Sequence, residues 1–344
     1  MTIWAVRAGK YGEGEKFALD NSCVVVGWDQ MPDLKPLDTR QKMRDAVEQA
    51  HADISDKLAS NWTGQLWAFR SEIKAGDLIV LPLKGTGTVA VGEALGRYEF
   101  RSDASLHGRH TQALRWLDVS LSRARIDSDI LYSLGSTLTV FRVQRAHAEE
   151  RLRALLGAKG GAPARPAGYA DVSLASDEAE IDLRTSALDQ IRLRIAQRFK
   201  GHRLANLVDA VLRAKGFETK LSLPGADGGV DILAAQGFFS EGAVSLVVQV
   251  KSEDRSTDAP TVRQLIGTMD KFQAARGLFV SWGGFKSSVE REFERDFFRL
   301  QFWTSDKLIE EILSTYDRFD ESLKALLPLE RVWMLVQDAE DEEP

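Results

Sequence analysis

Cysteine, histidine and long apolar runs are all scarce in this chain of 344 residues. A single cysteine, Cys23, excludes an internal disulfide framework and a cysteine-rich zinc site. The five histidines include no pair spaced four residues apart, which argues against a histidine-based metal site on a helix. No apolar run approaches the roughly 18–20 residues of a membrane span, and the N-terminus lacks the residue order of a secretory signal. We therefore expect a cytoplasmic protein without membrane contact.

The net charge of −6 does not exclude a nucleic-acid partner, because the acidic residues are unevenly distributed. Five of them lie in the last seven residues, DAEDEEP, and we predict a solvated acidic tail over residues 333–344. Residues 151–200 are basic, with nine Lys and Arg against six Asp and Glu. Overall charge therefore does not identify the partner.

The N-terminal part of the chain, residues 1–143, has the pattern of a β domain. Short segments rich in Val and Ile predict six strands, at 3–6, 23–26, 77–82, 88–94, 115–119 and 139–143. One helix is expected over Thr39–Ser60, with Asp38 or Thr39 as its N-cap. GTGTVA at 85–90 is similar to a dinucleotide-binding loop, but a strand follows it, so we predict a hairpin turn. Many short strands with few helices favour a small, partly closed barrel.

A second domain, of α/β type, is predicted over residues 186–332. The segment before it, 149–185, contains GAKGGAPARPAG and has no periodicity, which is typical of a linker. The pattern beyond it predicts helices and strands around a mixed sheet. The expected helices are 187–199, 202–215, 260–275, 287–298 and 306–317, and the expected strands are 218–223, 230–235, 244–251, 278–282 and 300–303.

Two segments of this second domain carry the candidate catalytic residues: PGADGGVDILAA at 224–235 and LVVQVKS at 246–252. Asp231 lies in a predicted strand directly after a Gly-Gly turn. The two-residue period of a strand puts Gln249 and Lys251 on the same face of the next strand. A Gln and a Lys that are buried need polar partners, and Asp231 on an adjacent antiparallel strand would supply one. A structural ion pair between Asp231 and Lys251 is the alternative interpretation.

These residue types suit metal-dependent hydrolysis of a phosphodiester. The Asp231 carboxylate, the Gln249 amide oxygen and the backbone carbonyl of Val250 are hard oxygen ligands of the kind that Mg²⁺ prefers. Lys251 can orient or help to deprotonate the attacking water and stabilise the charge that develops on the phosphate. Asp227, in the turn, is a further candidate, although Asp-Gly-Gly is also ordinary turn chemistry.

GADGGVD followed by VVQVK resembles the signature of Mrr-type endonucleases, the branch of the PD-(D/E)xK superfamily that has QxK in place of the usual acid. The later segments APTVRQLIGTM, GLFVSWGGF and FFRLQFWTSDKLIEEIL resemble the same branch, so the similarity covers residues 200–330. It implies a restriction-endonuclease-like αβββαβ core with a mixed sheet and Mg²⁺-dependent DNA cleavage. It also implies that Asp231, Gln249 and Lys251 are the catalytic residues.

One position departs from the pattern of that branch. Its first helix usually carries a Glu where this chain has Ala205, which cannot bind a metal. His202, Asn206 and Asp209 are the candidate replacements. A capping or packing role is the alternative for His202, at the start of its helix.

The N-terminal domain, residues 1–148, resembles PUA-like folds, including the EVE subgroup. The resemblance rests on the succession IWAVRAG, VVVGW, WAFRSEIKAGDLIVLP and VGEALGRYEF. It implies binding of RNA, or of a modified DNA base that is flipped out and stacked on aromatic side chains. Trp28 and Phe69 are the candidate base-binding residues because each adjoins a loop. Packing in the core of the barrel is the alternative role for both.

The two resemblances together imply a type IV-like restriction enzyme of phage defence, in which one domain senses modified double-stranded DNA and the other cuts it. A homodimer or larger homo-oligomer is expected, because cutting both strands needs two active sites. Two alternatives stay open. Either the N-terminal domain senses RNA, a nucleotide or a phage protein, or the chain is a non-catalytic DNA-binding protein with a degenerate nuclease fold.

Overall fold

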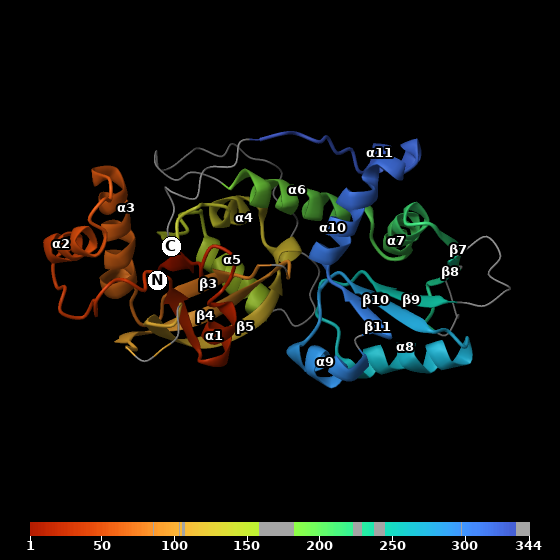
Figure 1. Cartoon of the computed structure of the whole chain (residues 1–344), viewed down its shortest axis with the longest axis horizontal. Helices are drawn as coiled ribbons and strands as arrows, with labels where there is room; N and C mark the ends of the chain where they lie inside the picture. The colour runs from red at the N-terminus through yellow and green to blue at the C-terminus, as the bar shows by residue number, and fades with distance from the viewer. Residues whose placement is uncertain are drawn as a thin grey trace.

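The computed structural model describes residues 1–84, 86–102, 104, 107–157, 182–222, 229–236, 245–296 and 298–334. Two bodies lie next to each other along the longest axis, and each is built around its own sheet (Figure 1). Within the described ranges no helix has the length and the apolar character needed to cross a membrane. Most of the predicted acidic tail, residues 335–344, lies outside the described residues.

The N-terminal domain contains a six-stranded sheet in the order β2-β5-β4-β3-β1-β6. Neighbouring strands are antiparallel except β1 and β3, which run parallel. All six predicted strands are confirmed, as β1 (Ile3–Val6), β2 (Cys23–Val26), β3 (Leu78–Pro82), β4 (Thr88–Phe100), β5 (His110–Ser122) and β6 (Val140–Arg142). The mixed α+β character is confirmed too, but the predicted closure into a barrel is not observed among the described residues. α1 (Glu15–Asp20) packs on the edge strand β2 and α3 (Asp56–Trp67) contacts the edge strand β6, so helices lie at the two edges.

The single helix predicted over Thr39–Ser60 is two helices, α2 (Arg40–Ala50) and α3. The Thr39 hydroxyl accepts a hydrogen bond from the backbone N–H of Lys42 at 3.2 Å, which confirms one of the two expected N-caps. Ser55 begins the second helix in the same way, since its hydroxyl accepts from the N–H of Leu58 at 3.3 Å. The remaining short elements of this domain are η1 (Ala68–Glu72), η2 (Arg123–Arg125), α4 (Ser128–Leu134) and α5 (Ala148–Gly157).

The C-terminal domain is a five-stranded mixed sheet between two layers of helices, in the order β11-β10-β9-β8-β7. β7, β8 and β9 form an antiparallel meander, and β10 and β11 continue the sheet in parallel. α7 and α10 pack on one face and α8 and α9 on the other (Figure 1). The elements are α7 (His202–Ala214), β7 (Phe217–Leu221), β8 (Ile232–Gln236), β9 (Leu246–Lys251), α8 (Ala259–Lys271), β10 (Arg276–Ser281), α9 (Ser287–Glu292), η3 (Glu294–Asp296), β11 (Leu300–Trp303), α10 (Ser305–Thr315), η4 (Tyr316–Arg318) and α11 (Glu321–Leu326).

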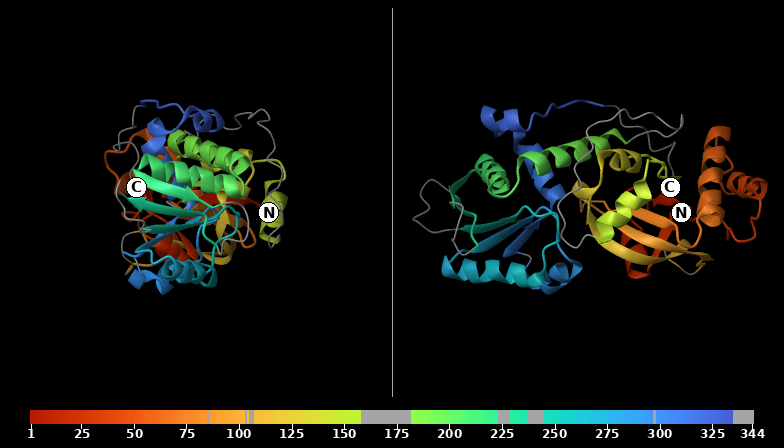
Figure 2. Two further views of the ribbon diagram at one scale, coloured as in Figure 1. Left: turned by 90° about the vertical axis from the view of Figure 1, so that its right-hand side faces the viewer. Right: turned by 180° about the vertical axis from the view of Figure 1, so that it is seen from behind.

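Helix α6 (Leu183–Arg198) connects the two domains. Its N-terminal end is held to the first domain, where the N–H of Asp182 donates to the carbonyl of Gly135 at 2.9 Å. Leu193 packs against the apolar core of the first domain, and Ile195 is buried in the core of the second. Figure 2 shows the helix running over both bodies. The predicted linker, 149–185, therefore contains α5 and the start of α6, and residues 158–181 lie outside the described residues.

The GTGTVA segment is part of the hairpin between β3 and β4, so the prediction of a turn is confirmed. Gly87 in this turn has φ of +65°, and a Cβ atom there would lie 2.4 Å from Ser305 Oγ and 3.0 Å from Asp306 Oδ1. Only glycine fits this left-handed position without strain and without displacing the start of α10. The turn of the first domain therefore docks on the second domain.

A buried chain of alternating charges lies beside this turn. Arg123 of η2 donates from Nε to Asp189 Oδ1 of α6 at 2.8 Å, and Arg192 donates from Nη1 to the same oxygen at 2.5 Å. Arg192 also pairs with Asp306 of α10. Because burial removes water from these ions, each needs its partners in place. The four residues thus join the N-terminal domain, α6 and the C-terminal domain.

Glu15, the first residue of α1, gives the fold a measurable pH dependence. Burial raises the pKa of its carboxyl from 4.5 to about 7, although it accepts a hydrogen bond from the N–H of Lys84 at 2.8 Å. The folded state therefore holds a proton that the unfolded state has lost, and its stability falls as the pH rises through this window. We expect Glu15→Gln to raise the free energy of unfolding by about 1–2 kcal/mol near pH 8 and to leave it unchanged near pH 4. Urea unfolding at the two pH values tests this, and an equal gain at both would contradict it.

Candidate active site

β8 and β9 bring Asp231 and Gln249 together. Asp231 immediately precedes β8, and Ile232 pairs with Val248 across the antiparallel ladder. The N–H of Asp231 donates to the carbonyl of Val248 at 2.9 Å. Its carboxylate oxygen Oδ2 accepts from the N–H of Val250 at 2.7 Å. Asp231 is therefore bonded to the residues on either side of Gln249.

Gln249 is buried and carries an unused acceptor. It is 2% exposed, and its amide oxygen Oε1 has no hydrogen-bond partner among the described residues. Val247 belongs to the core under α8 and Val248 to the core under α7, so the strand alternates as predicted, with Gln249 on the α8 side. Gly229 leaves room for the amide, since a Cβ there would lie 3.4 Å from Gln249 Nε2. A buried oxygen that accepts no hydrogen bond from the protein is free to interact with a ligand.

The electrostatic environment of Asp231 includes Lys251 and His202. Burial raises the pKa of the Asp231 carboxyl, and the N–H of Val250 opposes that shift. The positive charges of Lys251 and His202 also lower this pKa, whereas the negative charge of Glu253 raises it. The structure thus brings three of the predicted site residues and His202 to one end of the sheet.

The start of α7 is held against the end of β9. The N–H of Gly201 donates to Ser252 Oγ at 3.0 Å, which places His202 beside the strand that carries Lys251. Of the other candidate replacements for the absent Glu, Asn206 is exposed, and Asp209 is buried and paired with Arg213 at 2.5 Å. Ala205 is 1% exposed and packs in the core.

Sequence reasoning missed Ser252 and Glu253. Both directly follow the QVK segment, so their position after a candidate catalytic strand was the available signal. Asp227 lies outside the described residues.

The donor set suits Mg²⁺ better than a transition metal. The described residues contain no group of three His, Cys, Asp or Glu side chains that could hold a metal ion. Asp231 offers a carboxylate and Gln249 an unpartnered amide oxygen, and both are hard oxygen donors. Mg²⁺ is commonly bound by one or two carboxylates and keeps several waters, so a small set of protein oxygens fits it.

Gln249→Glu keeps an oxygen at this position and adds a negative charge. We expect this variant to retain cleavage within about tenfold of the parent, and Gln249→Met, which has no oxygen, to lose far more. The measurement is the Mg²⁺ dependence of the cleavage rate on one DNA substrate. Equal activities of the two variants would show that the oxygen has no role.

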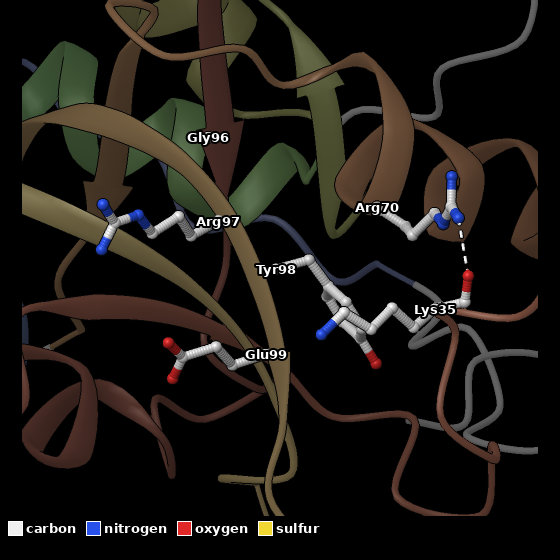
Figure 3. A pocket seen from close by; sticks show the side chains of 6 residues that line it. All are labelled: Lys35, Arg70, Gly96, Arg97, Tyr98 and Glu99. Atoms are coloured by element: carbon white, nitrogen blue, oxygen red, sulfur yellow. Dashed lines mark hydrogen bonds between the residues drawn. The ribbon is translucent and has the colours of Figure 1, made fainter.

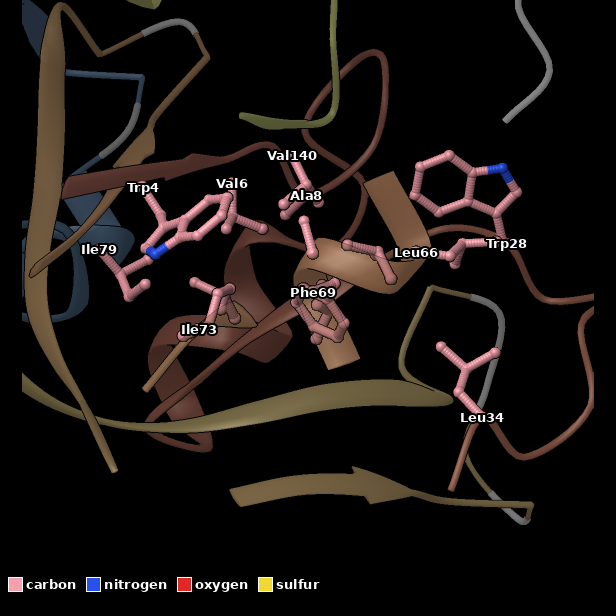
Figure 4. Packing of buried hydrophobic residues seen from close by; sticks show 14 of the residues in the cluster. Trp4, Val6, Ala8, Trp28, Leu34, Leu66, Phe69, Ile73, Ile79 and Val140 are labelled. Atoms are coloured by element: carbon pink, nitrogen blue, oxygen red, sulfur yellow. The ribbon is translucent and has the colours of Figure 1, made fainter. Parts of the chain in front are cut away.

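Trp28 and Phe69 were predicted to bind a base because each adjoins a loop. The structure places both side chains in the core. Trp28 is 1% exposed and Phe69 is 0% exposed (Figure 4). The Trp28 ring meets Trp62 edge to face at 6.1 Å, and the Phe69 ring meets Tyr98 at 6.3 Å. A position next to a loop does not make a side chain accessible, because both rings are enclosed by other residues of the apolar core. In this conformation neither ring has a free face for a base.

An open pocket of about 400 Å³ lies near these residues on the surface of the N-terminal domain (Figure 3). Three of its six lining residues are basic and one is acidic: Lys35, Arg70, Gly96, Arg97, Tyr98 and Glu99. Arg70 is fixed by hydrogen bonds to the carbonyls of Leu34 and Lys35, at 3.2 and 2.7 Å. Arg97 points away from Tyr98, Lys35 and Arg70 (Figure 3). Exposed basic side chains of this kind are suited to contact a nucleic-acid backbone.

The two domains match different protein families. Residues 196–312 match a family described as restriction endonuclease (Mrr_cat), and residues 4–141 match a domain of unknown function (DUF8426). No curated protein matches the chain. The PUA-like interpretation of the first domain stays a prediction.

Two solved structures are similar to the chain. The DNA modification-dependent restriction endonuclease AspBHI has 14% sequence identity and a TM-score of 0.32, over 79% of this chain and 72% of that one. The MspJI restriction endonuclease in complex with a 27-mer oligonucleotide has 16% identity and a TM-score of 0.29, over 94% and 79%. Both TM-scores are below the level at which a shared fold follows. The family match does not depend on them: residues 196–312 are similar to a restriction endonuclease family.

Proposed function

We propose that the chain is a Mg²⁺-dependent DNA endonuclease that cleaves modified DNA. The observation that carries the proposal is the buried, unpartnered Oε1 of Gln249 beside the carboxylate of Asp231, in a domain that matches restriction endonucleases. A purely structural ion pair between Asp231 and Lys251 would not explain why the buried Oε1 of Gln249 accepts no hydrogen bond.

In this proposal Asp231, Gln249 and the carbonyl of Val250 hold Mg²⁺. The bound ion supplies Lewis-acid activation of the phosphate and a more acidic water. Lys251 orients the attacking water and stabilises the negative charge that develops on the phosphate oxygens. Burial of Asp231 keeps competing water away from its carboxylate, which strengthens its interaction with a cation.

We assign the recognition of the modified base to the N-terminal domain. The basic pocket of Lys35, Arg70 and Arg97 is suited to contact phosphates near a recognised base. The buried charge chain keeps this domain docked on the nuclease domain. Because each chain has one active site, we propose that a homodimer or larger homo-oligomer cuts both strands, in a phage-defence role.

The test is a panel of unmodified, methylated, hydroxymethylated and glucosylated DNA incubated with the full chain, with and without Mg²⁺. We expect cleavage of at least one modified DNA, only when Mg²⁺ is present, and little cleavage of unmodified DNA. Equal cleavage of all the substrates would overturn the sensing role. No cleavage of any DNA would favour a non-catalytic DNA-binding protein.

A further inference from the structure

A cavity of about 210 Å³ lies at the junction of the two domains, beside the residues that follow β9. The first domain contributes residues 124–127, and α6 with the turn after it contributes residues from 193 to 200. The nuclease domain contributes residues 252–254 and Trp282. The cavity is separate from the Asp231 site, but Ser252 connects the two, since it directly follows Lys251.

Much of the lining is apolar. Phe199 and Trp282 are 4% and 3% exposed and belong to the core of the nuclease domain. Ile126 and Leu193 reach the cavity from the core of the first domain. Aromatic and aliphatic walls of this kind favour a ligand with flat, weakly polar faces.

Two polar groups of the lining have no hydrogen-bond partner among the described residues. The indole Nε1 of Trp282 is a buried donor without an acceptor. The carboxylate of Asp254 is half-buried; burial raises its pKa, and the positive charges of Lys200 and Arg125 in the same lining oppose that shift. An unmatched buried donor or acceptor is costly, so a ligand that satisfies both gains in binding.

We propose that this cavity binds a planar heterocyclic base, with a ring nitrogen or carbonyl oxygen accepting from Trp282 Nε1 and an N–H group donating to Asp254. Nucleobases carry an acceptor and a donor side by side on one edge and have flat faces for the apolar walls. The volume limits the ligand to a single base or nucleoside. The lining carries three acidic side chains, Asp127, Glu253 and Asp254, against the two basic side chains Arg125 and Lys200, so it has no net positive charge to attract a phosphate.

Such a base has two possible sources, a free nucleoside or a base extruded from bound DNA. The second source rests on the proposed function, and the first does not. In both cases the ligand contacts both domains, so binding stabilises their docked arrangement.

The test uses the full chain and two sets of ligands. The first set is deoxyadenosine, deoxyguanosine, deoxycytidine and thymidine, each titrated by calorimetry and by thermal unfolding. The second is a modified DNA duplex with 2-aminopurine at successive positions, read by fluorescence. We expect saturable binding of at least one nucleoside, or an unstacked 2-aminopurine at a defined position. The responding set identifies the source.

Three variants and one control make the test specific. Trp282→Phe and Asp254→Ala each remove one polar partner and are expected to weaken binding about tenfold or more. Ala196→Leu, on the α6 wall, fills the cavity and is expected to abolish binding without lowering the unfolding temperature. Trp116→Phe is the control, because Trp116 Nε1 also lacks a partner but lies on β5, outside the cavity lining.

No response in either set would overturn the proposal, and so would binding that survives both Trp282→Phe and Ala196→Leu. Binding of a free nucleoside by a chain that cleaves no DNA would overturn the proposed function alone.

Discussion

Asp231→Ala is expected to abolish DNA cleavage and to leave DNA binding in place. Within the described ranges, Asp231 supplies the only carboxylate that is bonded directly to the QVK strand, through the N–H of Val250. Gln249 contributes a neutral oxygen and cannot hold Mg²⁺ by itself. We expect a loss of about 10³-fold or more in cleavage rate, with Lys251→Ala similarly severe. Single-turnover cleavage and an electrophoretic binding assay on the same modified DNA measure the two properties.

Asp317→Ala is the matched control, because this carboxylate is exposed and pairs with Arg331 on the surface. It is expected to cleave at the parent rate. The unfolding temperature of each variant shows whether a loss reflects misfolding. A folded Asp231→Ala variant that still cuts near the parent rate would place the active site elsewhere.

The second large effect concerns stability: Arg123→Ala is expected to destabilise the folded chain by about 3–5 kcal/mol. Arg123 is buried, and its removal leaves Asp189 with only Arg192 as a partner in the buried chain of charges. The carboxylate then stays in a nonpolar environment with part of its hydrogen bonding lost. Chemical unfolding of the full chain, followed by far-UV circular dichroism, measures the effect.

Arg299→Ala removes an ion pair of similar geometry from the surface, at 2.8 Å from Asp270. Its expected cost is below about 1 kcal/mol, because water and salt screen exposed charges. If both variants lower the free energy of unfolding by the same small amount, the stability of the folded chain does not depend on the buried chain of charges.

Local patterns predicted the strands correctly, including the strand that carries Gln249 and Lys251. The alternation of Gln249 with Val248 and Val250 depends only on the two-residue period of a strand, and the structure keeps it. The Thr39 cap is also a local signal, since the side chain bonds a backbone group three residues away. Such features need no information from distant parts of the chain.

The errors arose where contacts between distant residues decide the outcome. Arg192 and Asp189 look like surface charges on a basic helix, but their partners Asp306 and Arg123 lie 114 and 66 residues away in the chain. The helix over 187–199 was predicted, but its role in joining the two domains depends on those partners. Trp28 and Phe69 were misjudged for the same reason, because the segments that cover a ring are not visible in the residues beside it.

The position of α6 affects how the chain can be divided or recombined. A fragment that starts at residue 186 would lack Asp182, whose side chain caps the helix at the N–H of Thr185, 2.9 Å away. It would also expose Leu193 and the charged pair of Asp189 and Arg192, which the N-terminal domain covers in the full chain. A fragment that keeps the whole of α6 with the C-terminal domain should therefore begin before Asp182. An exchange of N-terminal domains between related chains would keep this docking only when the incoming domain also has a glycine at the position of Gly87 and an arginine at that of Arg123.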